Sequence, residues 1–108
     1  MNEIQTQSFS FLKLWNERPE LRGRLFAINN NSHNAIKGAY NRAMGVIAGV
    51  ADMCFIIEGG VVWIEWKGEK GRQSPDQVKF QSLVESFGHR YYIVRSYDEF
   101  IDIINTFA

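Results

Sequence analysis

Two short apolar segments joined by a pair of glycines lie in the middle of the sequence. Residues 53–57 and 61–64 are rich in Val, Ile, Phe and Trp, and Gly59 and Gly60 lie between them. β-Branched and aromatic residues favour strands, and a two-glycine linker between two such runs is typical of a tight hairpin turn. The sequence therefore predicts two adjacent antiparallel strands around which the rest of the chain is arranged.

Three charged residues flank this hairpin at the end away from the turn. Asp52 precedes the first strand and Glu65 and Lys67 end the second, so antiparallel pairing places Asp52 roughly opposite Glu65 to Lys67. Side chains alternate between the faces of a strand, so Glu65 and Lys67 share one face and Trp66 points to the other. On spacing alone, a solvated charge pair at a strand end explains these residues equally well. Their position within an apolar run, where an unpaired charge is costly, favours a functional role.

The arrangement suits the hydrolysis of phosphodiester bonds with a divalent metal ion. Mg²⁺ and Mn²⁺ prefer oxygen ligands, and Mg²⁺ usually takes only one or two protein carboxylates together with water and phosphate oxygens. Asp52 and Glu65 supply carboxylates, and the main-chain carbonyl of Trp66 is a candidate third ligand. The metal ion would polarise the phosphate and lower the pKa of a bound water, and Lys67 would orient that water or stabilise the transition state.

Six motifs follow one another in a fixed order along nearly the whole chain. They are Glu3 to Gln7, Phe26 to Asn30, Gly49 to Asp52, Glu65 to Lys67, Gly71 to Gln77 and Tyr92 to Ser96. A bare D…ExK pattern is weak, but this ordered set is more specific. It resembles the virus-type replication-repair nuclease (VRR-NUC) family of the PD-(D/E)xK superfamily.

This resemblance implies a restriction-endonuclease-like core and a role for each matched residue. It implies that Asp52 and Glu65 bind the metal, that Lys67 is the catalytic lysine, that Glu3 is a helix-borne acid and that Gln77 is the glutamine of the downstream motif. The sequence departs from the family pattern at Ala51, where the superfamily usually has proline, and at Asn29 to Asn31, where similar chains have a proline and glycines.

The order of predicted elements gives a mixed sheet flanked by helices, an α/β (α+β) fold. Hydrophobic spacing predicts apolar stripes on three of the four predicted helices. The predicted elements are a helix at 2–15 striped by Ile4, Phe11, Leu12 and Trp15, a strand at 25–28, a helix at 35–44, the hairpin, a helix from Ser74 to Gly88 striped by Phe80, Leu83, Val84 and Phe87, a strand at 91–94, and a helix after Ser96 striped by Phe100, Ile103, Ile104 and Phe107.

Helix capping offers a structural explanation for two of the candidate residues. Ser74 and Gln77 form a capping box around Pro75, which explains Gln77 without a catalytic role. Glu3 lies in the first turn of a helix, where the helix dipole stabilises any acid. The catalytic assignments of Glu3 and Gln77 therefore depend on the resemblance.

Candidate DNA contacts are basic and amide side chains outside the hairpin. The net charge is zero, with 12 Lys and Arg against 12 Asp and Glu, which argues against strong nonspecific DNA binding. Basic residues predominate only between Lys13 and Arg42, so one basic face is a possibility and a scattered solvated surface is the alternative. We expect phosphate contacts from Lys70 and Arg72, beside a helix N-terminus, and further DNA contacts from Asn30, His33, Lys37 and Arg42.

Length and composition favour a single domain spanning residues 1–108. No apolar run is long enough to cross a membrane, and no basic segment of the signal-peptide type begins the sequence. The lone Cys54 lies within a predicted strand and is expected to be a reduced thiol. We expect a cytoplasmic protein of a bacterial or phage-infected cell.

These observations predict a divalent-metal-dependent DNA endonuclease that uses Mg²⁺ or Mn²⁺ and acts on branched replication, repair or recombination intermediates. The superfamily resemblance implies products with a 3′-hydroxyl and a 5′-phosphate. Cutting both strands of DNA needs two sites, so a symmetric homodimer resembling Holliday-junction resolvases is expected. The alternatives are a noncatalytic DNA-structure-binding module on the same fold and an exonuclease or restriction-type nuclease.

Overall fold

A computed structural model describes residues 1–29 and 35–108 of the chain. Within these residues a four-stranded sheet has the order β1-β2-β3-β4. The pairs β1–β2 and β2–β3 are antiparallel, and the pair β3–β4 is parallel. This is the predicted order of elements and the predicted mixed sheet. In chain order they are α1 (Glu3–Glu17), β1 (Arg24–Ala27), α2 (Ala35–Ala43), β2 (Met53–Ile57), β3 (Gly60–Trp66), α3 (Pro75–Ser86), β4 (Arg90–Val94) and α4 (Tyr97–Phe107).

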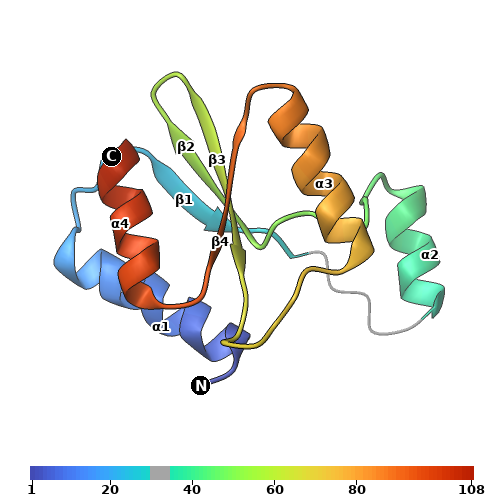
Figure 1. Ribbon diagram of the computed structural model, residues 1–108, viewed down its shortest axis with the longest axis horizontal. Helices are drawn as coiled ribbons and strands as arrows, with labels where there is room; N and C mark the ends of the chain where they lie inside the picture. Colours follow the sequence, from blue (N-terminus) through green and yellow to red (C-terminus); the bar gives the residue numbers. More distant parts are fainter. Residues whose placement is uncertain (30–34) are drawn as a thin grey trace.

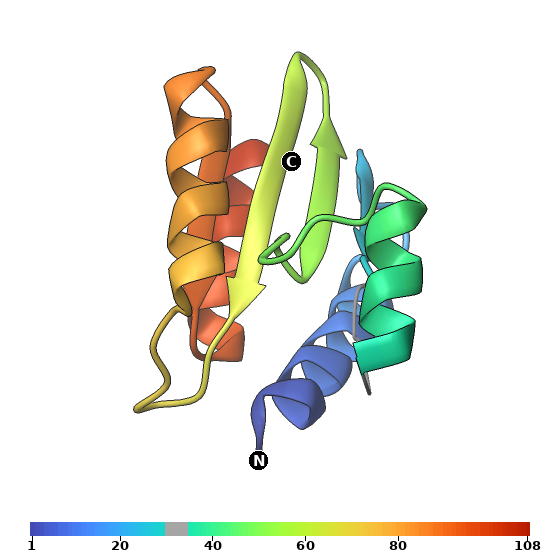
Figure 2. The same cartoon turned by 90° about the vertical axis from the view of Figure 1, so that its right-hand side faces the viewer.

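The helices lie on both faces of the sheet. Figure 1 shows α1 and α4 together on one side of the strands and α3 with α2 on the other. In Figure 1 α3 lies nearer to the strands than α2, and Figure 2 shows these two helices at opposite sides of the view. As a result, helices cover both faces of the two strands β3 and β4.

Alternation along β3 divides its side chains between two hydrophobic clusters. Trp66 points toward α4, where its ring centroid lies 5.2 Å from that of Phe100, and its indole N–H donates to Met53 Sδ at 3.3 Å. Trp63 points the opposite way and packs edge-to-face on Phe80 of α3 at 5.2 Å. Since Glu65 is two residues from Trp63, its side chain enters the α3 side of the sheet.

The hairpin is formed as predicted, with one small difference at the turn. Ile57 pairs with Gly60, so the connecting loop is Glu58 and Gly59, and Gly60 is the first residue of β3. Gly59 has a φ of 90°, a left-handed conformation that glycine adopts without steric cost. The two strands then pair without interruption up to Met53 and Ile64, which brings their other ends together.

The predicted stripe of α4 is confirmed, but two other stripes are wrong in part. In α1, Ile4 and Leu12 are exposed, and the buried residues are Ser10 and Leu14. Leu14 is spaced three residues from Phe11, so the buried face is rotated from the predicted one. In α3, Phe80 and Val84 are buried, whereas Leu83 and Phe87 are exposed because none of the described elements covers that face of the helix.

Candidate active site

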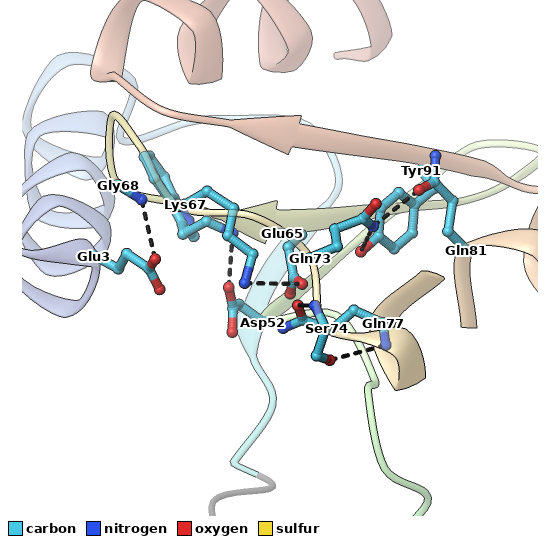
Figure 3. A network of polar contacts seen from close by, with 12 residues as sticks. Glu3, Asp52, Glu65, Lys67, Gly68, Gln73, Ser74, Gln77, Gln81 and Tyr91 are labelled. Carbon is cyan, nitrogen blue, oxygen red and sulfur yellow. Dashed lines mark hydrogen bonds and ion pairs between the residues drawn. The ribbon is translucent and has the colours of Figure 1, made fainter. Parts of the chain in front are cut away.

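Asp52 and Glu65 face each other at the end of the hairpin away from the turn. Met53 pairs with Ile64, so Asp52 lies across from Glu65 in the register of the strands. The main-chain N–H of Trp66 donates a hydrogen bond to Asp52 Oδ2 at 2.7 Å, which fixes the aspartate against β3. Figure 3 shows the two carboxylates converging from neighbouring strands, with Lys67 beside them.

Glu65 is a buried acid without a hydrogen-bond partner. Its side chain is 0% exposed, and neither carboxylate oxygen has a hydrogen-bond partner among the described residues. Burial and then the charge of Asp52 raise the pKa of Glu65 to about 7. Burial also raises the pKa of Asp52, although the Trp66 N–H opposes this rise by stabilising the carboxylate. Two buried carboxylates that face each other resist being ionised at the same time unless a cation binds between them.

Lys67 supplies one positive charge to this pair. Its Nζ lies 3.9 Å from Glu65 Oε2, and its side chain is largely buried. The prediction that Glu65 and Lys67 share a face is therefore confirmed. The main-chain N–H of Lys67 donates to the Val94 carbonyl at 3.0 Å, so the lysine is held in line with β4. One ammonium at this distance offsets part of the charge on two buried carboxylates.

The donor set fits a hard divalent cation. The two orphaned oxygens of Glu65 and the second oxygen of Asp52 are hard carboxylate ligands, and Mg²⁺ requires no more than one or two of these from protein. The N–H and C=O of one residue in an extended strand point the same way, so the Trp66 carbonyl lies on the Asp52 side of β3. Within residues 1–29 and 35–108, no group of three or more His, Cys, Asp or Glu side chains is arranged to bind a metal.

Two clefts meet at Asp52. A cleft of about 570 Å³ runs between α1 and the end of β1 and reaches Asp52 and Gln77. A second cleft of about 300 Å³ lies between α2 and the start of α3 and reaches the same two residues. Asp52 is therefore accessible from both sides, and an extended ligand that crossed it would contact α1 and α2 in turn.

Gln77 is placed beside Asp52 by the N-terminus of α3. Its Oε1 accepts the main-chain N–H of Ser74 at 2.8 Å, and its own N–H donates to Ser74 Oγ at 3.2 Å, which confirms the predicted capping box. Gly49 packs directly against this turn, since an added Cβ would lie 2.3 Å from the Asp76 carbonyl. The amide oxygen of Gln77 is thus already used in the cap, and its catalytic role stays a prediction.

Glu3 lies near the acid pair but makes a different contact. Its Oε1 accepts the main-chain N–H of Gly68 at 3.0 Å. Its charge contributes to the raised pKa of Asp52, as the smallest of the causes. The structure therefore places Glu3 at the edge of the site, in contact with the loop that follows Lys67.

The predicted DNA contacts are distributed over two regions. Lys70 and Arg72 are exposed on the loop after β3, and Lys37 and Arg42 are exposed on α2, with Arg42 lining the second cleft. Asn30 and His33 lie outside the described residues. Other basic residues between Lys13 and Arg42 contact other parts of the fold: Arg18 donates to Asn105, and Lys13 lies over the Tyr97 ring. Arg22, for example, pairs with Glu58 at 2.6 Å at the far end of the hairpin.

Three residues near the site were not assigned from the sequence. Arg95 donates to two carbonyls of the loop after Lys67. Gln73 donates to the hydroxyl of Tyr91 at 3.2 Å, and Tyr91 lies near Glu65, whose charge adds to the effect of burial in raising the tyrosine pKa. Parallel strands end at the same edge of a sheet, so the position of Arg95 directly after β4 was a usable signal. The contacts of Gln73 and Tyr91 have no local sequence pattern.

Comparison with known proteins identifies the fold. No family model matches the sequence, and no curated protein is similar to it. A solved structure of a VRR_NUC domain protein superposes with a TM-score of 0.78 and 20% sequence identity, over 99% of this chain and 88% of that one. The predicted VRR-NUC fold is thus confirmed, and the acid pair lies in a nuclease-type fold.

Proposed function

We propose that this chain, which has the fold of a VRR-NUC nuclease domain, is a divalent-metal-dependent DNA endonuclease. The observation that carries the proposal is the buried Glu65 carboxylate, which has no hydrogen-bond partner among the described residues and faces Asp52. Burying a charge that makes no hydrogen bond costs several kcal/mol, and the Lys67 ammonium 3.9 Å away offsets only part of the charge of two acids. A structure that needs only stability has no reason to keep such a group. A cation held between the two acids would provide the missing partner.

Each residue of the site has a separate task in this proposal. Asp52, Glu65 and the carbonyl of Trp66 would hold Mg²⁺ or Mn²⁺. Such an ion, when bound, polarises a phosphate oxygen and makes water a better nucleophile. Lys67 donates its N–H groups toward the attacked phosphate, where they stabilise the negative charge that develops in the transition state. Water adds to phosphorus as the bond to the 3′ oxygen breaks, which leaves a 3′-hydroxyl and a 5′-phosphate.

The clefts on either side of Asp52 supply a path for the DNA backbone. Lys70 and Arg72 lie on the loop that leads from Lys67 to the N-terminus of α3. Arg42 lines the cleft between α2 and the start of α3. Phosphates are stabilised by basic side chains and by the free N–H groups of a helix N-terminus. These three residues therefore support DNA contacts on the loop after Lys67 and in the cleft between α2 and α3.

We further propose that the substrate is selected by its shape and that the enzyme cuts branched DNA. All the described elements belong to the sheet or to its helical layers, which gives the fold no separate module for reading sequence. Cleavage of two strands would require two sites, which a symmetric homodimer provides. The cytoplasm of a bacterial or phage-infected cell is the proposed location.

A cleavage assay on defined DNA structures tests the proposal. Labelled four-way junction, flap and linear duplex are incubated with Mg²⁺ or Mn²⁺ and with wild type, Lys67→Ala or Arg22→Ala. We expect wild type and Arg22→Ala to cut junction or flap internally and Lys67→Ala to lose about 100-fold or more in rate. Arg22 is a suitable control because it lies at the far end of the hairpin, paired with Glu58.

The pattern of products separates the alternatives. Stepwise release of nucleotides from an end would indicate an exonuclease, and cutting of linear duplex at one sequence would indicate a restriction-type enzyme. Tight binding of junctions without cleavage in either metal would indicate a noncatalytic module. Equal cleavage by wild type and Lys67→Ala would remove Lys67 from the mechanism.

A further inference from the structure

A tight turn follows Lys67 and carries one of the proposed phosphate contacts. The N–H of Gly71 donates to the carbonyl of Gly68 at 3.0 Å, which closes a turn with Glu69 and Lys70 at its exposed tip. Arg72 comes directly after it. Glycine and exposed charged residues give such a turn little cohesion of its own, so its position depends on contacts from elsewhere.

Arg95 holds the turn from the side of β4. Its Nη1 donates to the Gly68 carbonyl at 2.5 Å and to the Gly71 carbonyl at 2.8 Å, so one nitrogen joins both ends of the turn. Parallel pairing of Trp66 with Val94 brings the residues that follow each strand to the same edge of the sheet. Arg95 is therefore placed by the sheet itself, one residue beyond the end of β4.

Glu3 holds the same turn from the side of α1. Its Oε1 accepts the N–H of Gly68 at 3.0 Å, as Figure 3 shows. A Cβ added to Gly71 would lie 3.0 Å from the same oxygen, so the absence of a side chain at Gly71 lets the turn approach the carboxylate. Glu3 and Arg95 thus contact both ends of one turn from elements far apart in the sequence.

We infer that Glu3 and Arg95 are positioning residues that clamp the turn Gly68–Gly71 and thereby hold Lys70 and Arg72 beside the acid pair. The clamp acts through hydrogen bonds to the main chain of the turn. The expected effect of the clamp on DNA binding rests on the proposed function. Its effect on how well the turn is ordered does not. Hydrogen bonds that involve a charged side chain are among the stronger ones, which suits the task.

This inference gives Glu3 a role that differs from that of a metal-bound or catalytic acid. The contact with Gly68 needs only an acceptor oxygen, which glutamine also provides. Glu3→Gln should therefore preserve the clamp, and Glu3→Ala should remove it. For an acid that binds metal, both substitutions would be damaging because the charge is lost in each.

Limited proteolysis with trypsin measures the order of the turn directly, because Lys70 and Arg72 are themselves cleavage sites. We expect Arg95→Ala and Glu3→Ala to be cut at these sites about tenfold faster than wild type, since each loses its hydrogen bonds to the turn. Glu3→Gln and Arg95→Lys should stay close to wild type. Arg90→Ala is the matched control on β4, where Arg90 stacks on Phe107 4.8 Å away.

Two binding measurements complete the test. Mn²⁺ affinity should be the same in Arg95→Ala and wild type, because Arg95 contacts only main-chain carbonyls of the turn. In a Lys67→Ala background that does not cut, adding Arg95→Ala should weaken binding of a four-way junction several-fold. A faster tryptic cut without any DNA binding by the parent protein would support the clamp and defeat the proposed function.

Two results would overturn the inference. One is a wild-type rate of tryptic cleavage in both Arg95→Ala and Glu3→Ala. The other is a Glu3→Gln protein that is cut as fast as Glu3→Ala and has lost Mn²⁺ affinity, which would make Glu3 a metal-bound acid.

Discussion

Lys67 Nζ lies 3.9 Å from Glu65 Oε2 on a face of β3 that is otherwise covered by apolar side chains of α3 and β4. The lysine is the nearest cation to an acid that has no hydrogen-bond partner among the described residues. One ammonium faces two carboxylates, so the site has an unmatched negative charge. That imbalance is the basis of the predictions for pH dependence and for metal binding.

Glu65 makes the stability of the metal-free protein depend on pH. Its pKa in the folded chain is about 7, against an ordinary value of 4.5, so between these pH values the folded chain holds a proton that the unfolded chain has released. Stability falls with rising pH wherever the folded state binds more protons. We expect the free energy of unfolding to fall by about 3 kcal/mol from pH 4.5 to 7, at about 1.4 kcal/mol for each pH unit, and then to level off.

Urea denaturation of wild type and Glu65→Gln in the presence of EDTA checks this prediction. The amide cannot ionise, so the difference between the two proteins isolates the contribution of Glu65. A wild-type protein whose stability rises through this window relative to Glu65→Gln would contradict the raised pKa.

Gly49 sets the distance between the start of α3 and Asp52. Gly49 and Gly45 both have a left-handed φ, at 84° and 94°, but an added Cβ clashes with the Asp76 carbonyl only at Gly49 and meets nothing within 4 Å at Gly45. We expect Gly45→Ala to cost about 1–2 kcal/mol from backbone strain alone. Gly49→Ala should cost about 1–3 kcal/mol more because α3 must shift. Thermal or urea unfolding measures both, and equal losses would show that Gly49 is not in close contact with α3.

The centre of the site was predictable because strand geometry is local. A period of two places Glu65 and Lys67 on one face, and the short loop after Ile57 fixes the register that brings Asp52 opposite Glu65. The capping box of Ser74 and Gln77 was predictable for the same reason, since it joins residues three apart.

Two features were not predictable because they depend on tertiary contacts: which face of each helix is buried, and which residues hold the loop after Lys67. In α1, several apolar residues fit more than one stripe, and only packing against β3 and α4 decides that Leu14 is buried and Leu12 exposed. Arg95 and Gly68 are 27 positions apart, and Glu3 and Gly68 are 65 apart. Sequence spacing does not predict contacts between residues so far apart, so these contacts became apparent only from the folded structure.

The binding of a divalent cation to the acid pair is the claim on which the proposed chemistry depends, and calorimetric titration with Mn²⁺ at pH 7.5 measures it without any DNA. Ligand carboxylates must lose their protons to bind metal, so this pH favours the ionised pair. We predict that wild type binds Mn²⁺ and that Glu65→Gln binds it about tenfold more weakly or worse, whereas Arg22→Ala, changed at the far end of the hairpin, binds as wild type does. Equal Mn²⁺ affinity in wild type and Glu65→Gln, or no binding by wild type, would contradict the account.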